Sequence, residues 1–261
     1  MDHVQRTLYI PLYGKAYVSR RGLILKDKKA EGIWEREGFP LKGKAKSRWL
    51  AYYMGMRSVV FDRWTAQQLE ENPEAVVLHV GCGLDSRCLR VNVKACQWFD
   101  VDFPEVIEER KRYFQETESY HMLGSDIRQE DWLARIPGDR TAIIVMEGVS
   151  MYLKPEELKA VLKNLSDRFE KVKILMDCYT EFAAKASKYK NPINDVGVTK
   201  VYGLDDPAEL EGEHLRFCKS HEMTPQDLID QLQGMEKTIF RKLYAGKIAD
   251  GMYRLYEFEG V

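Results

Sequence analysis

The sequence predicts an α/β fold in which helices cover both faces of a mostly parallel sheet. Between residues 75 and 176, short apolar runs alternate with helical stretches, as expected when each strand is buried on both faces. A glycine-rich turn follows the first run directly, which is typical of a ligand-binding loop in such folds. The clear runs are Ala75–Val80, Gln97–Val101, Thr141–Met146 and Val172–Met176, and Tyr120–Leu123 is a weaker candidate.

Prolines mark the starts of the helices between these runs. Pro104 and Pro155 precede the predicted helices Glu105–Phe114 and Glu156–Phe169. Proline is favoured there because a first-turn N–H has no partner within the helix. In the second helix the apolar residues repeat every 3.6 residues, which predicts packing of one helix face on the sheet. Thr224–Pro225 indicates a further helix start.

The chain divides into two predicted parts at residues 72 and 73. Residues 1–72 are polar and helical up to a break at Asn72–Pro73, and we expect them to form an N-terminal helical cap packed on a core of residues 73–261. The alternation in Tyr253–Phe258 predicts a strand that joins the sheet antiparallel. Between about 180 and 222 the alternation of strands and helices is lost. We predict a lid or substrate-binding insertion there, with a structural decoration as the alternative.

The composition excludes several classes of protein. The 261 residues include 40 basic and 41 acidic side chains, so no strong net field attracts nucleic acid or an anionic membrane. The five cysteines are odd in number and lack C-x-x-C spacing, so we predict reduced thiols and no zinc site. No signal peptide or long apolar span is present, and we expect a cytoplasmic protein. Nothing in the sequence indicates an oligomeric state.

The segment after the first strand, Gly81-Cys82-Gly83, carries the central motif. Its glycines allow a tight turn and a close approach of a ligand, and its N–H groups favour an anionic group. A dinucleotide fingerprint requires a third glycine, and Ser86 stands at that position. The motif therefore favours a nucleoside with a carboxylate, such as S-adenosylmethionine (SAM), over a pyrophosphate cofactor.

Acidic residues end three successive runs of the predicted sheet. Asp102 follows the second strand, where a carboxylate can accept hydrogen bonds from two ribose hydroxyls, and Asp100 has the same side-chain parity. Asp126 follows the third strand and could reach an adenine amino group. Glu147 ends the fourth strand, where an unpaired carboxylate is costly to bury and needs a partner.

These motifs resemble the leucine carboxyl methyltransferase superfamily, and within it the branch of tetracenomycin-type polyketide O-methyltransferases. The resemblance covers residues 57 to 155 well and the last third of the chain in outline. Ser86 stands where threonine is commoner and keeps the hydroxyl. The matching segments are Arg57–Asp62, Val80–Arg87, Trp98–Val106 and Glu147–Pro155.

The resemblance implies a class I SAM-dependent methyltransferase fold, Rossmann-like with a mostly parallel seven-stranded sheet. The implied activity is O-methylation of a hydroxyl or carboxylate on a small, polyketide-like acceptor, with S-adenosylhomocysteine (SAH) as product. Arg57 would pair with the SAM carboxylate and Glu147 would receive the amino group. Gly81 and Gly83 would lie against the methionine part, Asp102 would hold the ribose, Asp126 and Ile127 would border the adenine, and Lys15 would lie near the cofactor, with a surface lysine as its alternative.

No catalytic base is assigned. A carboxylate acceptor needs none, whereas a phenol or alcohol would benefit from one. His214, His221 and Tyr179 lie in or near the predicted lid and are hypothesised bases. His79 lies inside a strand and is interpreted as a core residue.

Four other functions are alternatives to this one. A protein C-terminal carboxyl methyltransferase shares the fold, and a non-catalytic SAM-binding regulatory protein would keep the same cofactor residues. A nicotinamide-dependent dehydrogenase is disfavoured by Ser86. A nucleic-acid methyltransferase is disfavoured because Glu147-Gly148-Val149 replaces an Asn/Asp-Pro-Pro-aromatic motif and no basic tail is present.

Overall fold

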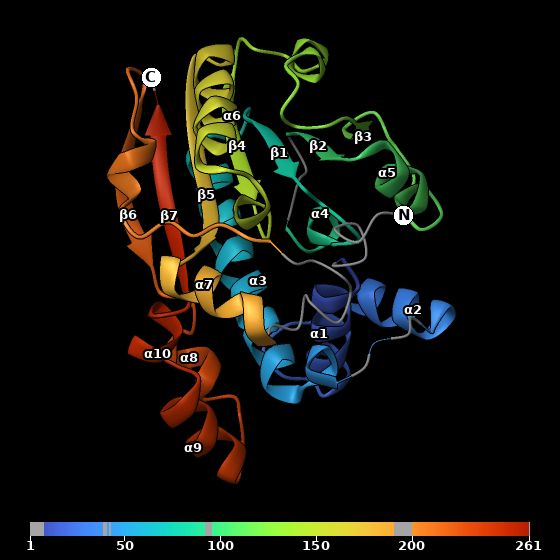
Figure 1. Cartoon of the computed structure of the whole chain (residues 1–261). Coiled ribbons are helices and arrows are strands. Elements are labelled where there is room, and N and C mark those ends of the chain that lie inside the picture. Colours follow the sequence, from blue (N-terminus) through green and yellow to red (C-terminus); the bar gives the residue numbers. More distant parts are fainter. Residues whose placement is uncertain (1–7, 39–40, 42, 92–95, 191–199, 261) are drawn as a thin grey trace.

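The computed structural model describes residues 8–38, 41, 43–91, 96–190 and 200–260. Figure 1 shows the arrangement of the elements. The strands are β1 (Val76–Val80), β2 (Gln97–Asp102), β3 (Tyr120–Gly124), β4 (Thr141–Met146), β5 (Lys171–Tyr179), β6 (Leu215–His221) and β7 (Tyr253–Gly260). The α-helices are α1 (Tyr9–Arg20), α2 (Lys28–Glu37), α3 (Arg48–Glu71), α4 (Arg87–Arg90), α5 (Pro104–Lys111), α6 (Pro155–Arg168), α7 (Glu181–Lys190), α8 (Gln226–Ile229), α9 (Gly234–Leu243) and α10 (Lys247–Asp250), and the 3-10 helices are η2 (Gly43–Lys46), η3 (Asp131–Arg135), η4 (Ser150–Tyr152) and η6 (Pro207–Leu210).

In the described residues the seven strands form one sheet in the order β3-β2-β1-β4-β5-β7-β6. Strands β1 to β5 run parallel, and β7 pairs antiparallel with both β5 and β6. The predicted mostly parallel α/β sheet is confirmed, including the weak third strand and the antiparallel last strand. The chain leaves β1 first toward β2 and later returns to β4 on the other side, so the order reverses between β1 and β4. Ligands of such sheets bind at the carboxyl ends of the strands beside that reversal.

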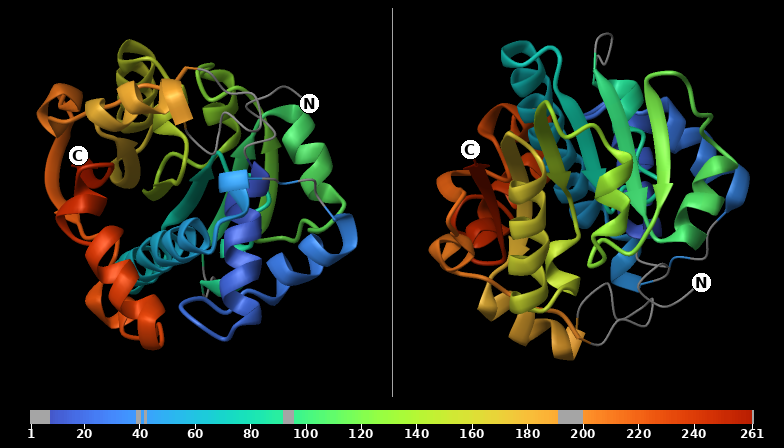
Figure 2. Two further views of the ribbon diagram at one scale, coloured as in Figure 1. Left: turned by 60° about the horizontal axis from the view of Figure 1, so that its bottom comes forward. Right: turned by 90° about the horizontal axis from the view of Figure 1, so that it is seen from above.

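Alternate residues of each strand enter two hydrophobic cores, one on each face of the sheet. On one face Val77 and Val145 join a core with Phe61 of α3, and α4 and α5 cover the same face. On the other face Leu78 packs in a core with Leu162 of α6. Figure 2 shows α3 and α6 on opposite sides of the sheet. The apolar stripe predicted for the helix after Pro155 is therefore the face that α6 buries.

The predicted lid range contains a strand of the sheet. Leu215–His221 forms β6, the edge strand beyond β7. Most of its residues are exposed or half-buried, because an edge strand has a neighbouring strand on one side only. Its sequence therefore lacks the apolar run of the central strands. The earlier part of the range forms α7, and residues 191–199, with the first Asn/Asp-rich turn, lie outside the described residues.

All five cysteines are free in the structure. Four of them are buried, and Cys218 is exposed. Within the described segments, no helix has the length and apolar character needed to cross a membrane.

Candidate active site

A cavity of about 880 Å³ opens at the carboxyl ends of β1, β2, β3 and β4. Small-molecule sites commonly occupy roughly 300 to 1,000 Å³, so this cavity can hold a cofactor and part of a second ligand. The structure brings all eight residues predicted to bind the cofactor to its wall. They are Lys15, Arg57, Gly81, Gly83, Asp102, Asp126, Ile127 and Glu147.

The loop after β1 requires glycine where the ligand is expected. Gly81 has φ 68°, in the left-handed region, and its N–H donates to the carbonyl of Val101 at 2.7 Å. A Cβ atom at this position would lie 2.1 Å from Cγ2 of Val149, so no side chain fits without movement. Gly83 also has a positive φ, of 50°. The backbone of this loop therefore forms part of the cavity floor with no side chain in the way.

Asp102 lies at the end of β2 and faces the cavity. Its carboxylate accepts hydrogen bonds from the N–H groups of Gly83 and Phe103, each at 2.8 Å. Burial raises the pKa of Asp102 to about 6, despite these two hydrogen bonds. A carboxylate in this position has further lone pairs, so it can also accept hydrogen bonds from ligand hydroxyls.

Asp100 does not share the position of Asp102. It lies further back along β2, is fully buried, and accepts hydrogen bonds from Trp98 at 2.8 Å and Tyr120 at 2.6 Å. Arg110 also contacts its carboxylate. The suggestion that Asp100 helps to hold a ribose is therefore wrong, because its acceptor sites are used in the core.

Asp126 and Ile127 follow β3, and both line the cavity. Asp126 is half-buried and accepts hydrogen bonds from the side chain of Arg128, which lowers its pKa below the usual value. Ile127 is also half-buried and packs against the core under α6. The two residues place a carboxylate beside an apolar side chain, which suits the amino group and the face of a purine.

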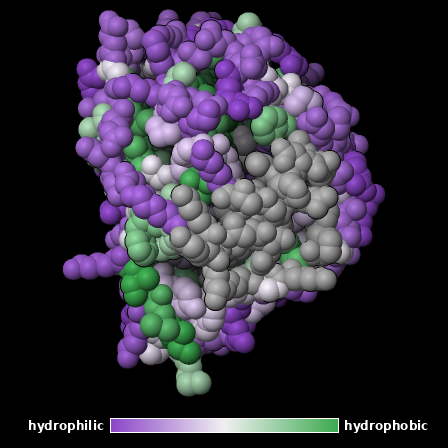
Figure 3. All heavy atoms as spheres, viewed as in Figure 1, coloured by the Kyte–Doolittle hydropathy of each residue, from purple (hydrophilic) through white to green (hydrophobic). Residues whose placement is uncertain are grey.

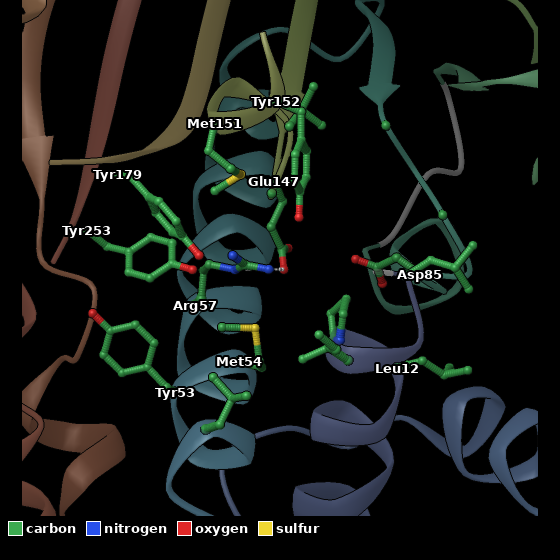
Figure 4. Close-up of a pocket in the computed structure, with 18 of the residues that line it drawn as sticks. Leu12, Tyr53, Met54, Arg57, Asp85, Glu147, Met151, Tyr152, Tyr179 and Tyr253 are labelled. Atoms are coloured by element: carbon green, nitrogen blue, oxygen red, sulfur yellow. Dashed lines mark hydrogen bonds and ion pairs between the residues drawn. The ribbon is translucent and has the colours of Figure 1, made fainter. Parts of the chain in front are cut away.

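Arg57 and Glu147 form the centre of a buried ion cluster. The Arg57 guanidinium lies 3.0 Å from Glu147 and 2.8 Å from Asp177 at the end of β5. Figure 4 shows this contact between Arg57 on α3 and Glu147. Arg87 contacts the second carboxylate oxygen of Glu147. Glu147 thus has the partners that its burial requires. Burial alone would raise the pKa of Glu147, but the neighbouring cations hold it below its usual value.

Lys15 is buried, so it is not a surface lysine. It lies on α1, is 3% exposed, and its ammonium group is 2.6 Å from Asp85 and 3.6 Å from Glu147. Asp85 in turn lies 2.8 Å from Arg90 of α4. The glycine loop, α1 and β4 are therefore linked by one chain of buried charges at the wall of the cavity.

Two members of this cluster were not singled out from the sequence. Asp85 lies within the glycine motif, and its position two residues after Gly83 was the available signal. Asp177 is fully buried at the end of β5 and accepts a hydrogen bond from the N–H of Gly148 at 2.6 Å. An aspartate ending an apolar run is the same signal that identified Glu147.

The three hypothesised bases lie in different parts of the structure. His221 on β6 lies 2.5 Å from Glu257, and neither His221 nor His214 lines the cavity. Both were predicted near a lid, and the formation of β6 carries them to the edge of the sheet instead. Tyr179 does line the cavity. His79 is buried between Arg87 and Asp100, as predicted for a core residue, and burial lowers its pKa.

The part of the cavity beyond Arg57 is apolar and aromatic, and we call it the acceptor chamber. Its walls come from α3, η4, α7 and the segment from α9 to the start of β7. Exposed apolar side chains gather over α9 and α10 at its mouth, where Figure 3 shows a green patch. The chamber is lined by Leu50, Tyr53, Met54, Met151, Tyr179, Ala183, Leu243, Tyr244, Ile248, Met252 and Tyr253.

The donor set of the cavity fits SAM. One end offers both cations and carboxylates within a few ångströms, which suits an amino acid group. The middle offers a cavity-facing carboxylate, Asp102, and a glycine loop in which Gly81 has no room for a side chain. The far end offers Asp126 and Ile127.

Comparisons with known proteins agree with this geometry. The sequence profile for leucine carboxyl methyltransferase matches residues 7–166. The tetracenomycin polyketide synthesis O-methyltransferase TcmP of Streptomyces glaucescens is 31% identical over 245 residues, which are 90% of this chain and 89% of that protein.

Solved structures share the fold at low sequence identity. A DUF574 family protein from Streptomyces avermitilis has a TM-score of 0.63 and 10% identity, covering 97% of each chain. Magnesium protoporphyrin IX methyltransferase from Synechocystis, solved with bound SAH, has a TM-score of 0.52 and 12% identity, covering 90% of this chain and 95% of that one. With its family, fold and cavity agreeing, the chain belongs to the leucine carboxyl methyltransferase family and is a methyltransferase that uses SAM.

Proposed function

We propose that this enzyme transfers the SAM methyl group to an oxygen of a small, largely apolar acceptor, such as an aromatic polyketide. The observation that carries the proposal is the acceptor chamber, which is continuous with the cofactor residues and lined by aromatic and aliphatic side chains. Such walls suit a flat hydrophobic molecule better than a charged peptide. The name of the relative TcmP, a polyketide O-methyltransferase, supports the same acceptor class.

The site residues take the following proposed roles toward SAM. Bound SAM supplies an activated methyl group on a sulfonium. Lys15, Arg57 and Glu147 hold the amino acid end, and Asp102 holds the ribose hydroxyls. Asp126 and Ile127 border the adenine, and Gly81 and Gly83 let the cofactor lie against the loop.

Residues 1–72 act in this proposal as a cap rather than a separate domain. Lys15 on α1 and Arg57 on α3 reach the cofactor end of the cavity, while Tyr53 and Met54 of α3 line the chamber. We likewise propose that α7 is the part of the insertion that contacts the acceptor, since Ala183 lines the chamber.

The chamber favours an acceptor oxygen that is already ionised. None of the eleven residues that define the chamber is a histidine, aspartate or glutamate. Glu147 at its inner end is held ionised by three cations, which makes it a poor base. We therefore propose a carboxylate or an acidic phenol as the acceptor. An oxygen lone pair forms the new O–CH₃ bond while the sulfur–methyl bond breaks and its electron pair stays on sulfur, giving SAH. A carboxylate loses no proton, and an acidic phenol gives its proton to water beforehand.

Methyl transfer from labelled SAM tests this proposal. With 1-hydroxy-2-naphthoic acid, which carries a carboxylate beside a phenol, we expect a labelled product that mild alkali hydrolyses, since alkali cleaves a methyl ester and leaves a methyl ether. The controls are enzyme without acceptor and a peptide ending in a free leucine carboxylate. Label in the peptide and in no small acid or phenol would show a protein carboxyl methyltransferase instead. SAH binding without transfer to any acceptor would indicate a regulatory protein.

A further inference from the structure

Tyr179 and Tyr253 form a fixed pair at the inner wall of the acceptor chamber. Tyr179 ends β5 and Tyr253 begins β7, and the two residues are paired in the antiparallel register of these strands. Cross-strand partners project on the same face of a sheet, so both rings face the cavity. Their centroids are 4.6 Å apart at an interplanar angle of 88°, an edge-to-face contact that holds the rings in place.

The hydroxyl ends of this pair point toward Arg57. Figure 4 shows both hydroxyls converging beside the guanidinium, at the boundary between the cofactor residues and the chamber. Tyr179 is 4% exposed and Tyr253 is half-buried. A hydrogen bond between the two hydroxyls uses one of their two O–H donors, so the pair keeps one donor for a further partner.

The surroundings of the pair make it a polar spot in an apolar wall. Met54 and Met151 lie on either side of the Arg57 side chain in the same close-up, and they offer no strong hydrogen-bond donor. Burial raises the pKa of Tyr253 well above its usual value, and the neighbouring Tyr179 raises it further, so the hydroxyl stays protonated and acts as a donor. A protonated hydroxyl beside a guanidinium favours an anionic oxygen.

Resting on the proposed function, we propose that the hydroxyl pair of Tyr179 and Tyr253 donates a hydrogen bond to the anionic oxygen group of the acceptor and orients it for methyl transfer. In this arrangement Arg57 contributes positive charge beside the anionic group, while Glu147 and Asp177 hold its guanidinium in place. The apolar remainder of the acceptor extends outward along the chamber. The pair therefore selects which oxygen of the acceptor is presented to the methyl group.

Tyr53 provides a matched control for this pair. It lies on α3, lines the same chamber, and packs its ring 5.6 Å from that of Tyr253. Its hydroxyl points away from Arg57 and donates to the carbonyl of Ala249 at 3.4 Å. Removing this hydroxyl changes the same kind of surface without removing a donor from the proposed position.

The test measures binding of 2-naphthoate, an apolar aromatic carboxylate, to SAH-saturated protein by calorimetry. The variants are Tyr179→Phe, Tyr253→Phe, the double variant and Tyr53→Phe, all of which keep their rings. We expect the double variant to bind 2-naphthoate roughly 10- to 100-fold more weakly than wild type, the range for one hydrogen bond to a charged group. Tyr53→Phe should change its affinity less than about twofold, since its hydroxyl faces elsewhere. SAH affinity should stay the same in every variant, and the unfolding midpoint should fall by only about a few degrees, the effect of a lost hydrogen bond.

Three results would overturn the inference: unchanged 2-naphthoate affinity in the double variant, no binding to wild type, or a parallel loss of SAH affinity. The last would show that the tyrosines act on the cofactor site or the fold. These failures are separate from failure of the proposed function. Methyl transfer that persists in the double variant would support the proposed function and contradict the inference. Tyrosine-dependent 2-naphthoate binding without any methyl transfer would support the inference and contradict the proposed function.

Discussion

Replacement of Asp102 by alanine is expected to weaken SAH binding at least about 100-fold, because two hydrogen bonds to a carboxylate are lost at roughly 1.5–3 kcal/mol each. The carboxylate is positioned by the N–H groups of Gly83 and Phe103 and faces the cavity. The SAH affinity of Asp102→Asn should lie between those of the wild type and the alanine variant, since its amide oxygen can still accept one hydrogen bond. Isothermal titration with SAH measures both, with NAD as a negative control ligand.

The same experiment has an expected pH dependence. Because burial raises the pKa of Asp102 to about 6, this carboxyl is protonated in the free enzyme below that pH. SAH that binds to the ionised form must then displace a proton, so its dissociation constant should rise about tenfold per pH unit below 6 and stay constant above it. Asp102→Asn should bind weakly at every pH. A wild-type affinity that is constant from pH 5 to 8, or an unchanged affinity in the alanine variant, would remove Asp102 from the cofactor site.

Replacement of Glu147 by glutamine is expected to destabilise the protein by about 3–5 kcal/mol, the usual cost of removing one partner from a buried ion pair. Glu147 is 8% exposed and contacts Arg57 and Lys15 at 3.0 and 3.6 Å, together with Arg87. At this chain length the midpoint of thermal unfolding should fall by roughly 6–20 °C. SAH binding should be lost as well, since the three cations would lose their shared partner.

A matched control for this variant is Glu259→Gln. Glu259 pairs with Lys173 across β5 and β7, and its side chain is 46% exposed, so water already screens the pair. Its loss should cost less than about 1 kcal/mol. Thermal unfolding followed by circular dichroism compares the two variants. Equal shifts in the two midpoints would mean that the buried cluster contributes no more to stability than a surface pair.

The parallel strands, and the residues at their carboxyl ends that line the cavity, could be predicted because their signals are local. Each parallel strand is a short apolar run, and Asp102, Asp126 and Glu147 follow such runs directly. Parallel strands end at one edge of a sheet, so residues far apart in the sequence converge there without any knowledge of side-chain contacts. Lys15 lacked such a signal and was placed only by resemblance, and the structure buries it against Asp85.

The acceptor chamber could not be predicted because its walls are brought together by pairing over long distances. Tyr179 and Tyr253 are 74 residues apart and meet only through the antiparallel pairing of β5 and β7. The sequence also does not reveal β6. Its exposed position at the edge of the sheet leaves it without the apolar run that marks a central strand. For the same reason His221 could be mistaken for a lid residue, although it pairs with Glu257 on β7.

The two carboxylate partners of Arg57 bear on its predicted role in SAM binding. The resemblance assigns it to the SAM carboxylate, whereas its guanidinium is held between Glu147 and Asp177. A guanidinium has five N–H donors, so it can hold both carboxylates and still donate to a third. Asp177 therefore fixes the orientation of Arg57 from the side away from the cofactor loop.

A crystal structure of the enzyme with SAH tests the central claim most directly. The account predicts ribose hydroxyls on Asp102, adenine between Asp126 and Ile127, and the amino acid group beside Arg57 and Glu147, with the sulfur facing the acceptor chamber. SAH bound with its sulfur turned away from the chamber, or bound outside the cavity, would contradict it.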